Sequence, residues 1–225
     1  MFAEIGKSAR AMVAAALAAF SIPAAAGGPS TYQVTVTNLT HSINFTPILV
    51  ASLRRPVSIL ELGSPASDEL AAVAEGGDLG PLTALLEAKP RVVDVENSGG
   101  LLGPGESVTV IVDAARGARY ISLASMMLPT NDGFIALDGV RVGGHHTATY
   151  YSPGYDAGSE ANDEWCANIP GPTCDGVGPS PGVNFGDEGY VHIHRGIHGV
   201  GDLAAATYDW RNPVAKITIV RVKGD

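Results

Sequence analysis

Apolar and polar residues alternate over many short segments of this chain. The clearest case is 32–38 (YQVTVTN), in which every second side chain is apolar, as in a β-strand with one buried face. The segments 107–113 (SVTVIVD) and 215–222 (AKITIVRV) are rich in β-branched residues, which strands favour. The same criteria predict strands at 32–38, 45–53, 57–62, 91–96, 107–113, 120–128, 133–137, 147–151 and 215–222.

Two segments between these strands follow a helical pattern instead. In 64–77 (SPASDELAAVAEGG), Ser64 stands at the N-cap position, Pro65 follows at the first helical position, and two glycines close the segment. A second short helix is predicted at 81–88. We therefore predict an all-β fold, an antiparallel β-sandwich with two short inserted helices, in one domain that spans residues 27–225.

Composition and charge narrow the classes of function. The chain has 225 residues, of which 45% are hydrophobic and 16% are charged, so it can bury a core. The 28 glycines and 15 prolines are typical of a fold with many turns. A formal net charge of −9 argues against a nucleic-acid-binding protein and against docking to an anionic membrane surface.

Residues 1–26 have the pattern of a secretory signal peptide. Lys7 and Arg10 precede an apolar run at 11–20, and small residues follow up to a cleavage pattern that ends at Ala26. The rival interpretation is an uncleaved anchor, but the run falls short of the roughly 20 residues that a membrane-spanning helix needs. We expect a secreted or periplasmic protein that does not insert into a membrane after cleavage.

Export decides how the two cysteines are interpreted. Cys166 and Cys174 enclose a short loop with two prolines and a glycine. In an oxidising compartment such a pair predicts a disulfide, which would pin this loop rather than hold the whole domain together. A metal site is the less simple interpretation, because there is no second cysteine pair to complete it.

Several acidic residues lie in loops between the predicted strands. Asp132 and Asp138 flank the segment 133–137, and at ~3.3 Å per residue their carboxylates lie about 20 Å apart, too far to share an ion. Asp132, Asp156 and Glu160 form the better set, provided that their two loops meet at one end of the sandwich. Their oxygens suit calcium. The alternative that these acids are solvated turn residues stays open.

The segment GYVHIHRGIHG offers a second candidate metal site. His192 and His194 would face the same side of a strand, and His198 could reach back from a turn to complete a Zn²⁺ or Cu²⁺ site. His145 and His146 are further candidate ligands. The alternative is that these histidines pack or form hydrogen bonds at the surface.

The chain carries none of the common catalytic motifs. G-x-S-x-G, H-E-x-x-H, the P-loop and a G-x-G-x-x-G after a strand are all missing from the sequence. We therefore expect a binding protein rather than an enzyme. A hydrolase that uses two carboxylates as acid and base stays open as a third interpretation.

Four parts of the sequence together resemble the spondin N-terminal domain, the module of F-spondin, mindin and many secreted bacterial proteins. They are TYQVTVTNLT followed by FTPILVASL, then SMMLPTNDGFIAL, YDAGSEAND and NPVAKITIVRV, and they cover most of residues 31–223. The resemblance implies a C2-like antiparallel sandwich that binds calcium at one end and acts in adhesion or recognition outside the cell. Its partner would be an extracellular or cell-surface protein or glycan.

The resemblance also implies a set of calcium ligands. The aspartate of the family's Pro-x-x-Asp loop corresponds to Asp132, and the first and last residues of its Asp-Ala-Gly-Thr-Asp loop correspond to Asp156 and Glu160. Two residues depart from the family, because Gly133 stands where many relatives carry tryptophan and Glu160 replaces aspartate. The prediction is a secreted, non-catalytic calcium-binding module. The alternative is a transition-metal protein that uses the three histidines of 192–198, with or without enzymatic activity.

Overall fold

The computed structural model describes residues 30–114, 117–142, 147–176 and 186–223. The predicted signal peptide and the candidate ligands His145 and His146 lie outside these residues. The strands are β1 (Thr31–Asn38), β2 (Asn44–Phe45), β3 (Leu49–Leu53), β4 (Val92–Asn97), β5 (Ser107–Asp113), β6 (Tyr120–Leu128), β7 (Gly133–Arg141), β8 (Ala148–Ser152), β9 (Tyr155–Asp156), β10 (His192–Ile193) and β11 (Ala215–Val222). The helices are α1 (Asp68–Gly76), α2 (Gly80–Glu87), α3 (Ala205–Tyr208) and a 3₁₀ turn, η1 (Cys166–Asn168).

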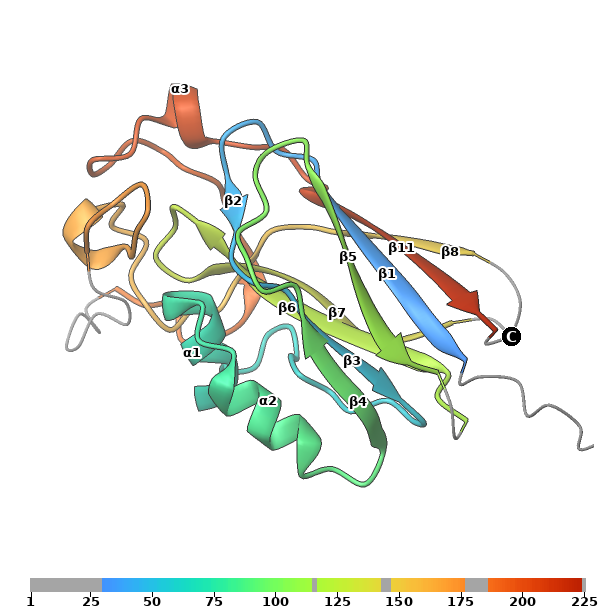
Figure 1. The fold of residues 1–225 in the computed structure, drawn as a ribbon. Helices are drawn as coiled ribbons and strands as arrows, with labels where there is room; N and C mark the ends of the chain where they lie inside the picture. The colour runs from blue at the N-terminus through green and yellow to red at the C-terminus, as the bar shows by residue number, and fades with distance from the viewer. Residues whose placement is uncertain (1–29, 115–116, 143–146, 177–185, 224–225) are drawn as a thin grey trace, which may run out of the picture.

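Two antiparallel sheets pack face to face (Figure 1). The smaller sheet has the strand order β5-β1-β11-β8, and the larger has the order β10-β9-β7-β6-β3-β4, with β2 also paired to β6. β1 and β11, near the two ends of the described chain, pair along their whole length. The predicted all-β class, the antiparallel sandwich and the two inserted helices are confirmed.

The alternation in β1 builds one side of the core. Tyr32, Val34 and Val36 point inward and are buried, whereas Thr35 and Thr37 lie on the outer face. The inward side chains join a single apolar cluster with residues of the larger sheet, among them Val50, Ile121, Leu123 and Ile135. Burial of this apolar surface between the sheets is the main favourable contribution to the stability of the sandwich.

Helices α1 and α2 cover the outer face of the larger sheet (Figure 1). Leu70 and Ala74 of α1 pack with Phe134 of β7, and Leu82 and Leu86 of α2 pack with β3. Strands β3, β6 and most of β7 are therefore covered on both faces. This explains why their sequences are continuous apolar runs rather than alternating ones.

The predicted strand at 57–62 is wrong, because this segment is irregular in the structure. The carboxylate of Asp138 accepts a hydrogen bond from the backbone N–H of Ile59 at 2.8 Å and another from the hydroxyl of Ser58 at 2.8 Å. The segment 57–62 is thus held by hydrogen bonds to a side chain of β7. A strand would instead be held by hydrogen bonds to the backbone of a neighbouring strand.

The predicted N-cap of the first helix is also wrong. Helix α1 begins after Ser67, whose side chain accepts a hydrogen bond from the N–H of Leu70 at 3.3 Å. The backbone of Ser64 is engaged elsewhere, because its N–H donates to Glu61 and its carbonyl accepts the N–H of Val191. The sequence pattern also missed β9 and α3, which are only two and four residues long.

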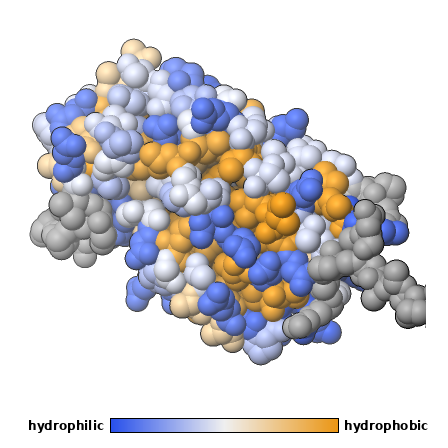
Figure 2. All heavy atoms as spheres, viewed as in Figure 1, coloured by the Kyte–Doolittle hydropathy of each residue, from blue (hydrophilic) through white to orange (hydrophobic). Residues whose placement is uncertain are grey.

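Figure 2, in the same view as Figure 1, shows apolar residues in the middle of this face, interrupted by hydrophilic ones. Large apolar side chains that remain exposed include Leu39, Leu101 and Ile111. Single exposed apolar residues of this kind are ordinary on folded proteins. Within the described part of the chain, no helix is both long enough and apolar enough to span a bilayer.

Candidate metal centre

Asp132 and Asp156 lie next to each other at one end of the larger sheet. Gly133, at the start of β7, pairs with Asp156 of β9, and the N–H of Ala157 donates to the carbonyl of Asp132 at 3.2 Å. The condition set by the sequence, that these two loops meet at one end of the sandwich, is therefore fulfilled.

Asp132 is completely buried. Its Oδ2 accepts the backbone N–H groups of Ser159 at 2.8 Å and Glu160 at 3.0 Å, whereas Oδ1 has no hydrogen-bond partner among the described residues. Burial raises the pKa of Asp132 well above its ordinary value, and the negative charges of Asp156 and Glu160 raise it further. A positive charge beside Oδ1 would relieve this cost.

Asp156 is also completely buried, and its carboxylate is held in place from two sides. Oδ1 accepts the N–H of Gly158 and Oδ2 accepts the side-chain amide of Asn162, both at 2.8 Å. Burial raises the pKa of Asp156, although these hydrogen bonds offset part of the effect. Glu160, the third predicted calcium ligand, is buried close enough to Asp132 to act on its charge.

His192 and Glu188 complete a second group of ligand atoms around Asp156. Nε2 of His192 lies 3.5 Å from Oδ1 of Asp156 and 3.9 Å from Oε2 of Glu188. One ligand atom from each of the three residues lies within 4.8 Å of the others, a spacing that can hold a metal ion.

The tautomer of His192 suits a metal ligand. Its Nδ1 lies 2.9 Å from the backbone carbonyl oxygen of Ile193, which can only accept, so Nδ1 carries the proton. In the neutral ring the lone pair of Nε2 then points toward two carboxylates. A proton or a metal ion must lie between them. Metal-bound histidines commonly donate the other ring N–H to a backbone carbonyl, which fixes the orientation of the ring.

His194 has a different environment. It is buried against Trp210, with ring centroids 4.9 Å apart, and its Nδ1 accepts the N–H of Gly196 at 2.9 Å. Burial is the main cause that lowers its pKa from 6.5 to about 3, and electrostatic repulsion from His192 and Arg195 contributes to the same shift. The neutral ring therefore carries its proton on Nε2, which lies 3.9 Å from Asp156. In this tautomer Nε2 has no lone pair for a metal.

The third predicted histidine, His198, is exposed, and its backbone N–H donates to Glu164. The structure thus brings His192 and His194 to the two oxygens of Asp156. Among the described residues, the group with metal-ligand spacing includes His192 but neither His194 nor His198.

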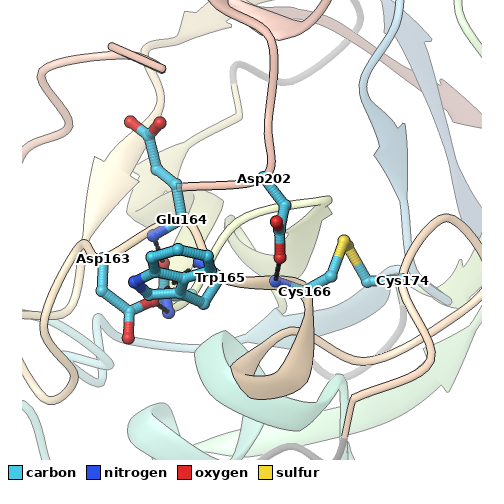
Figure 3. The surroundings of a disulfide bond; sticks show 7 residues. Asp163, Glu164, Trp165, Cys166, Cys174 and Asp202 are labelled. Carbon is cyan, nitrogen blue, oxygen red and sulfur yellow. Dashed lines mark hydrogen bonds between the residues drawn. A yellow bond between two sulfur atoms is a disulfide. The ribbon is translucent and has the colours of Figure 1, made fainter. Parts of the chain in front are cut away.

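A disulfide and several acidic side chains hold the loops that lie beside the candidate centre (Figure 3). Cys166 and Cys174 are bonded, as predicted. The side chain of Asp202 accepts the N–H of Cys166 at 3.0 Å, and Asp163 accepts the side-chain amide of Asn131 at 2.9 Å. These acids anchor backbone and side chains, so we regard them as structural.

Glu188 is the residue that the sequence analysis missed. It lies in GDEGY, four residues before His192, in a segment without regular secondary structure. Neither alternation nor a known ligand motif marks this glutamate. Its only signal in the sequence is its position four residues before the H-x-H pair, and such proximity is weak evidence for a metal ligand.

Comparison with known proteins finds no matching family model and no matching curated protein. The resemblance to the spondin N-terminal domain therefore stays a prediction from the sequence.

Proposed function

We propose that this chain is a secreted or periplasmic recognition module of spondin type, without catalytic activity, whose loops at one end are held together by a divalent cation. The observation that carries the proposal is the buried pair of Asp132 and Asp156. No lysine or arginine of the described residues lies within 4.0 Å of either carboxylate. Two adjacent buried carboxylates need a cation or protons to be stable.

Calcium is the first candidate for this cation. Asp132, Asp156 and Glu160 would supply carboxylate oxygens, and carbonyls or water would complete the six to eight ligands that calcium takes. The buried Oδ1 of Asp132, which lacks a hydrogen-bond partner among the described residues, is an oxygen that fits this role. The ion would neutralise the loops after β6 and β9 and fix their relative position.

A transition metal is the second candidate, and the geometry around His192 favours it. Asp156, Glu188 and His192 would supply two oxygens and one imidazole nitrogen. Calcium rarely takes nitrogen ligands, whereas zinc and copper accept this mixture. Of the three histidines in the predicted cluster, only His192 belongs to this set. Two carboxylates, Asp156 and Glu188, take the places of the other two histidines.

The two candidates differ in which variants lose the metal. We would measure the metal content of the purified mature protein by mass spectrometry, with melting curves in calcium, in zinc and in chelator. For calcium, we expect one ion per chain, lost in Asp132→Asn and Asp156→Asn but retained in His192→Gln. For zinc or copper, we expect loss in Asp156→Asn, Glu188→Gln and His192→Gln.

Saturating metal at about 100 times its dissociation constant should stabilise the fold by about 2.7 kcal/mol, or roughly 5–10 °C in Tm. Asp187→Asn, in the same loop as Glu188, and His41→Gln, on the surface, are matched controls that should keep the ion. A protein that binds neither metal and melts identically in chelator would contradict the proposal.

The partner would be an extracellular or cell-surface protein or glycan. The disulfide is compatible with an oxidising compartment outside the cytoplasm. We assign no partner residues.

A further inference from the structure

A polar cavity of about 460 Å³ lies on the other side of His194, beside α3. Its size is within the range of small-molecule binding sites. The lining comes from three short stretches of the loop region, which include His194 and Arg195, Ala205 of α3, and Asp209 to Arg211.

The floor of the cavity is a fixed structure. The buried rings of His194 and Trp210 pack there at an interplanar angle of 53°. Gly154 lies so close that an added Cβ would be 3.1 Å from Nε1 of Trp210. Gly196 has a φ of +96°, and a Cβ at this position would lie 2.2 Å from Oδ1 of Asp209. Glycine is therefore required at this wall, and the cavity has its shape before any ligand binds.

The distribution of charge around the cavity is unusual for this chain. Between residues 142 and 215 the sequence contains many carboxylates, but Arg195 and Arg211 are its only lysine or arginine residues. Both line this cavity. In a protein with a net charge of −9, the basic groups of the loop region converge on one site.

The one acid in the lining is already engaged. Oδ2 of Asp209 pairs with Nη1 of Arg211, and its Oδ1 accepts the N–H of Ile197 at 3.3 Å. Arg195 is exposed, and its Nη2 makes a long hydrogen bond of 3.4 Å to the carbonyl of Asn162. The guanidinium groups thus keep donor capacity for a further acceptor.

We propose that this cavity binds a small organic molecule through a carboxylate group, which Arg195 and Arg211 would grip above the His194–Trp210 floor. Guanidinium and carboxylate groups match in shape and form paired, charge-assisted hydrogen bonds. This site goes beyond the proposed function and does not depend on a metal ion at Asp156.

The tryptophans allow a direct test. The chain has two, Trp165 and Trp210, and Trp165 is half exposed. In a Trp165→Phe variant of the full-length mature protein, fluorescence reports on Trp210 alone. We expect glucuronate to give a saturable change in this fluorescence and its neutral counterpart glucose to give none.

The arginine variants decide whether the cavity is responsible. In the same background, Arg195→Gln and Arg211→Gln should each weaken glucuronate binding roughly ten-fold or more, while Arg55→Gln, on an exposed surface outside the cavity, should not. Melting curves would show that each variant folds. No saturable change, an equal response to glucose, or an affinity that neither arginine variant alters would overturn the proposal, whatever metal the protein binds.

Discussion

The buried acids near the metal centre differ in how far the backbone compensates their charge. Both carboxylate oxygens of Glu164 accept N–H groups from residues 198–200, at distances of 2.6 to 2.9 Å. Asp132 has two such donors on Oδ2, but among the described residues it has none on Oδ1. Hydrogen bonds of this kind stabilise the charged form of a carboxylate. Glu164 is therefore satisfied as an anchor of its loop, and Asp156 also has a donor on each oxygen, whereas Asp132 keeps one buried oxygen without a hydrogen-bond partner among the described residues.

His194 makes the free energy of unfolding of the metal-free protein decrease as the pH falls. Its pKa falls from 6.5 to about 3 on folding, so below pH 6.5 the unfolded chain binds a proton that the folded chain excludes. This contribution to stability is complete above pH 6.5 and is lost as the pH falls, by up to about 1.4 kcal/mol per pH unit.

We predict that His194→Gln flattens the pH dependence of the free energy of unfolding between pH 6.5 and pH 4.5. Urea titrations in chelator at several pH values would measure both slopes. Equal slopes would show that His194 is not held neutral by burial.

The turn after β9 is the element that joins the two groups of ligands. Asp156 ends this strand, Gly158 follows with a φ of +64°, and the carbonyl of Gly158 accepts the N–H of Gly189 at 2.9 Å. A Cβ at residue 158 would lie only 2.3 Å from the carbonyl oxygen of Tyr190. At this turn the backbone of Gly158 lies against the backbone of residues 189 and 190. This contact places the segment that contains Glu188 next to Asp156.

We predict that Gly158→Ala destabilises the fold more than Gly63→Ala does. Gly63 also has a positive φ, of +85°, but a Cβ there would meet nothing within 4 Å. Its substitution should cost roughly 1–3 kcal/mol through backbone strain alone, whereas residue 158 adds a steric clash with backbone atoms. Urea unfolding would compare the two variants, and metal content would show whether the centre survives. Equal losses of stability would contradict the close approach at Tyr190.

The sandwich could be predicted from the sequence because its strands form a local pattern. Inward and outward residues alternate in β1 and β11, and continuous apolar runs mark β3 and β6, which helices cover. The sequence proposed Asp132 and Asp156 as one set only on the condition that their loops meet at the same end of the sandwich, and the structure fulfils this condition.

The loop region between β9 and β11 could not be predicted, because distant side chains and backbone groups hold it. The carboxylate of Glu164 binds N–H groups 34 to 36 positions away, and Asn131 binds Asp163 across 32 positions. Such contacts leave no periodic trace in the sequence. For the same reason, neither Glu188 as a candidate ligand nor the convergence of Arg195 and Arg211 on one cavity could be predicted.

Removing the disulfide would test whether the sandwich and its loop region unfold together as one cooperative unit or separately. Cys174 and Ile169 pack into the main apolar cluster, but no residue of the loop belongs to either candidate ligand set.

Closing so small a loop contributes about 2–3 kcal/mol to the free energy of unfolding, so a Cys166→Ala/Cys174→Ala variant should melt roughly 4–12 °C lower. We predict that this variant still unfolds in one transition and keeps any metal that the intact protein binds, because hydrogen bonds within the segment 156–164 and one from Asn131 hold this segment. Calorimetry and metal content would measure both properties. A second transition or loss of the ion would show that the disulfide loop supports the metal centre directly.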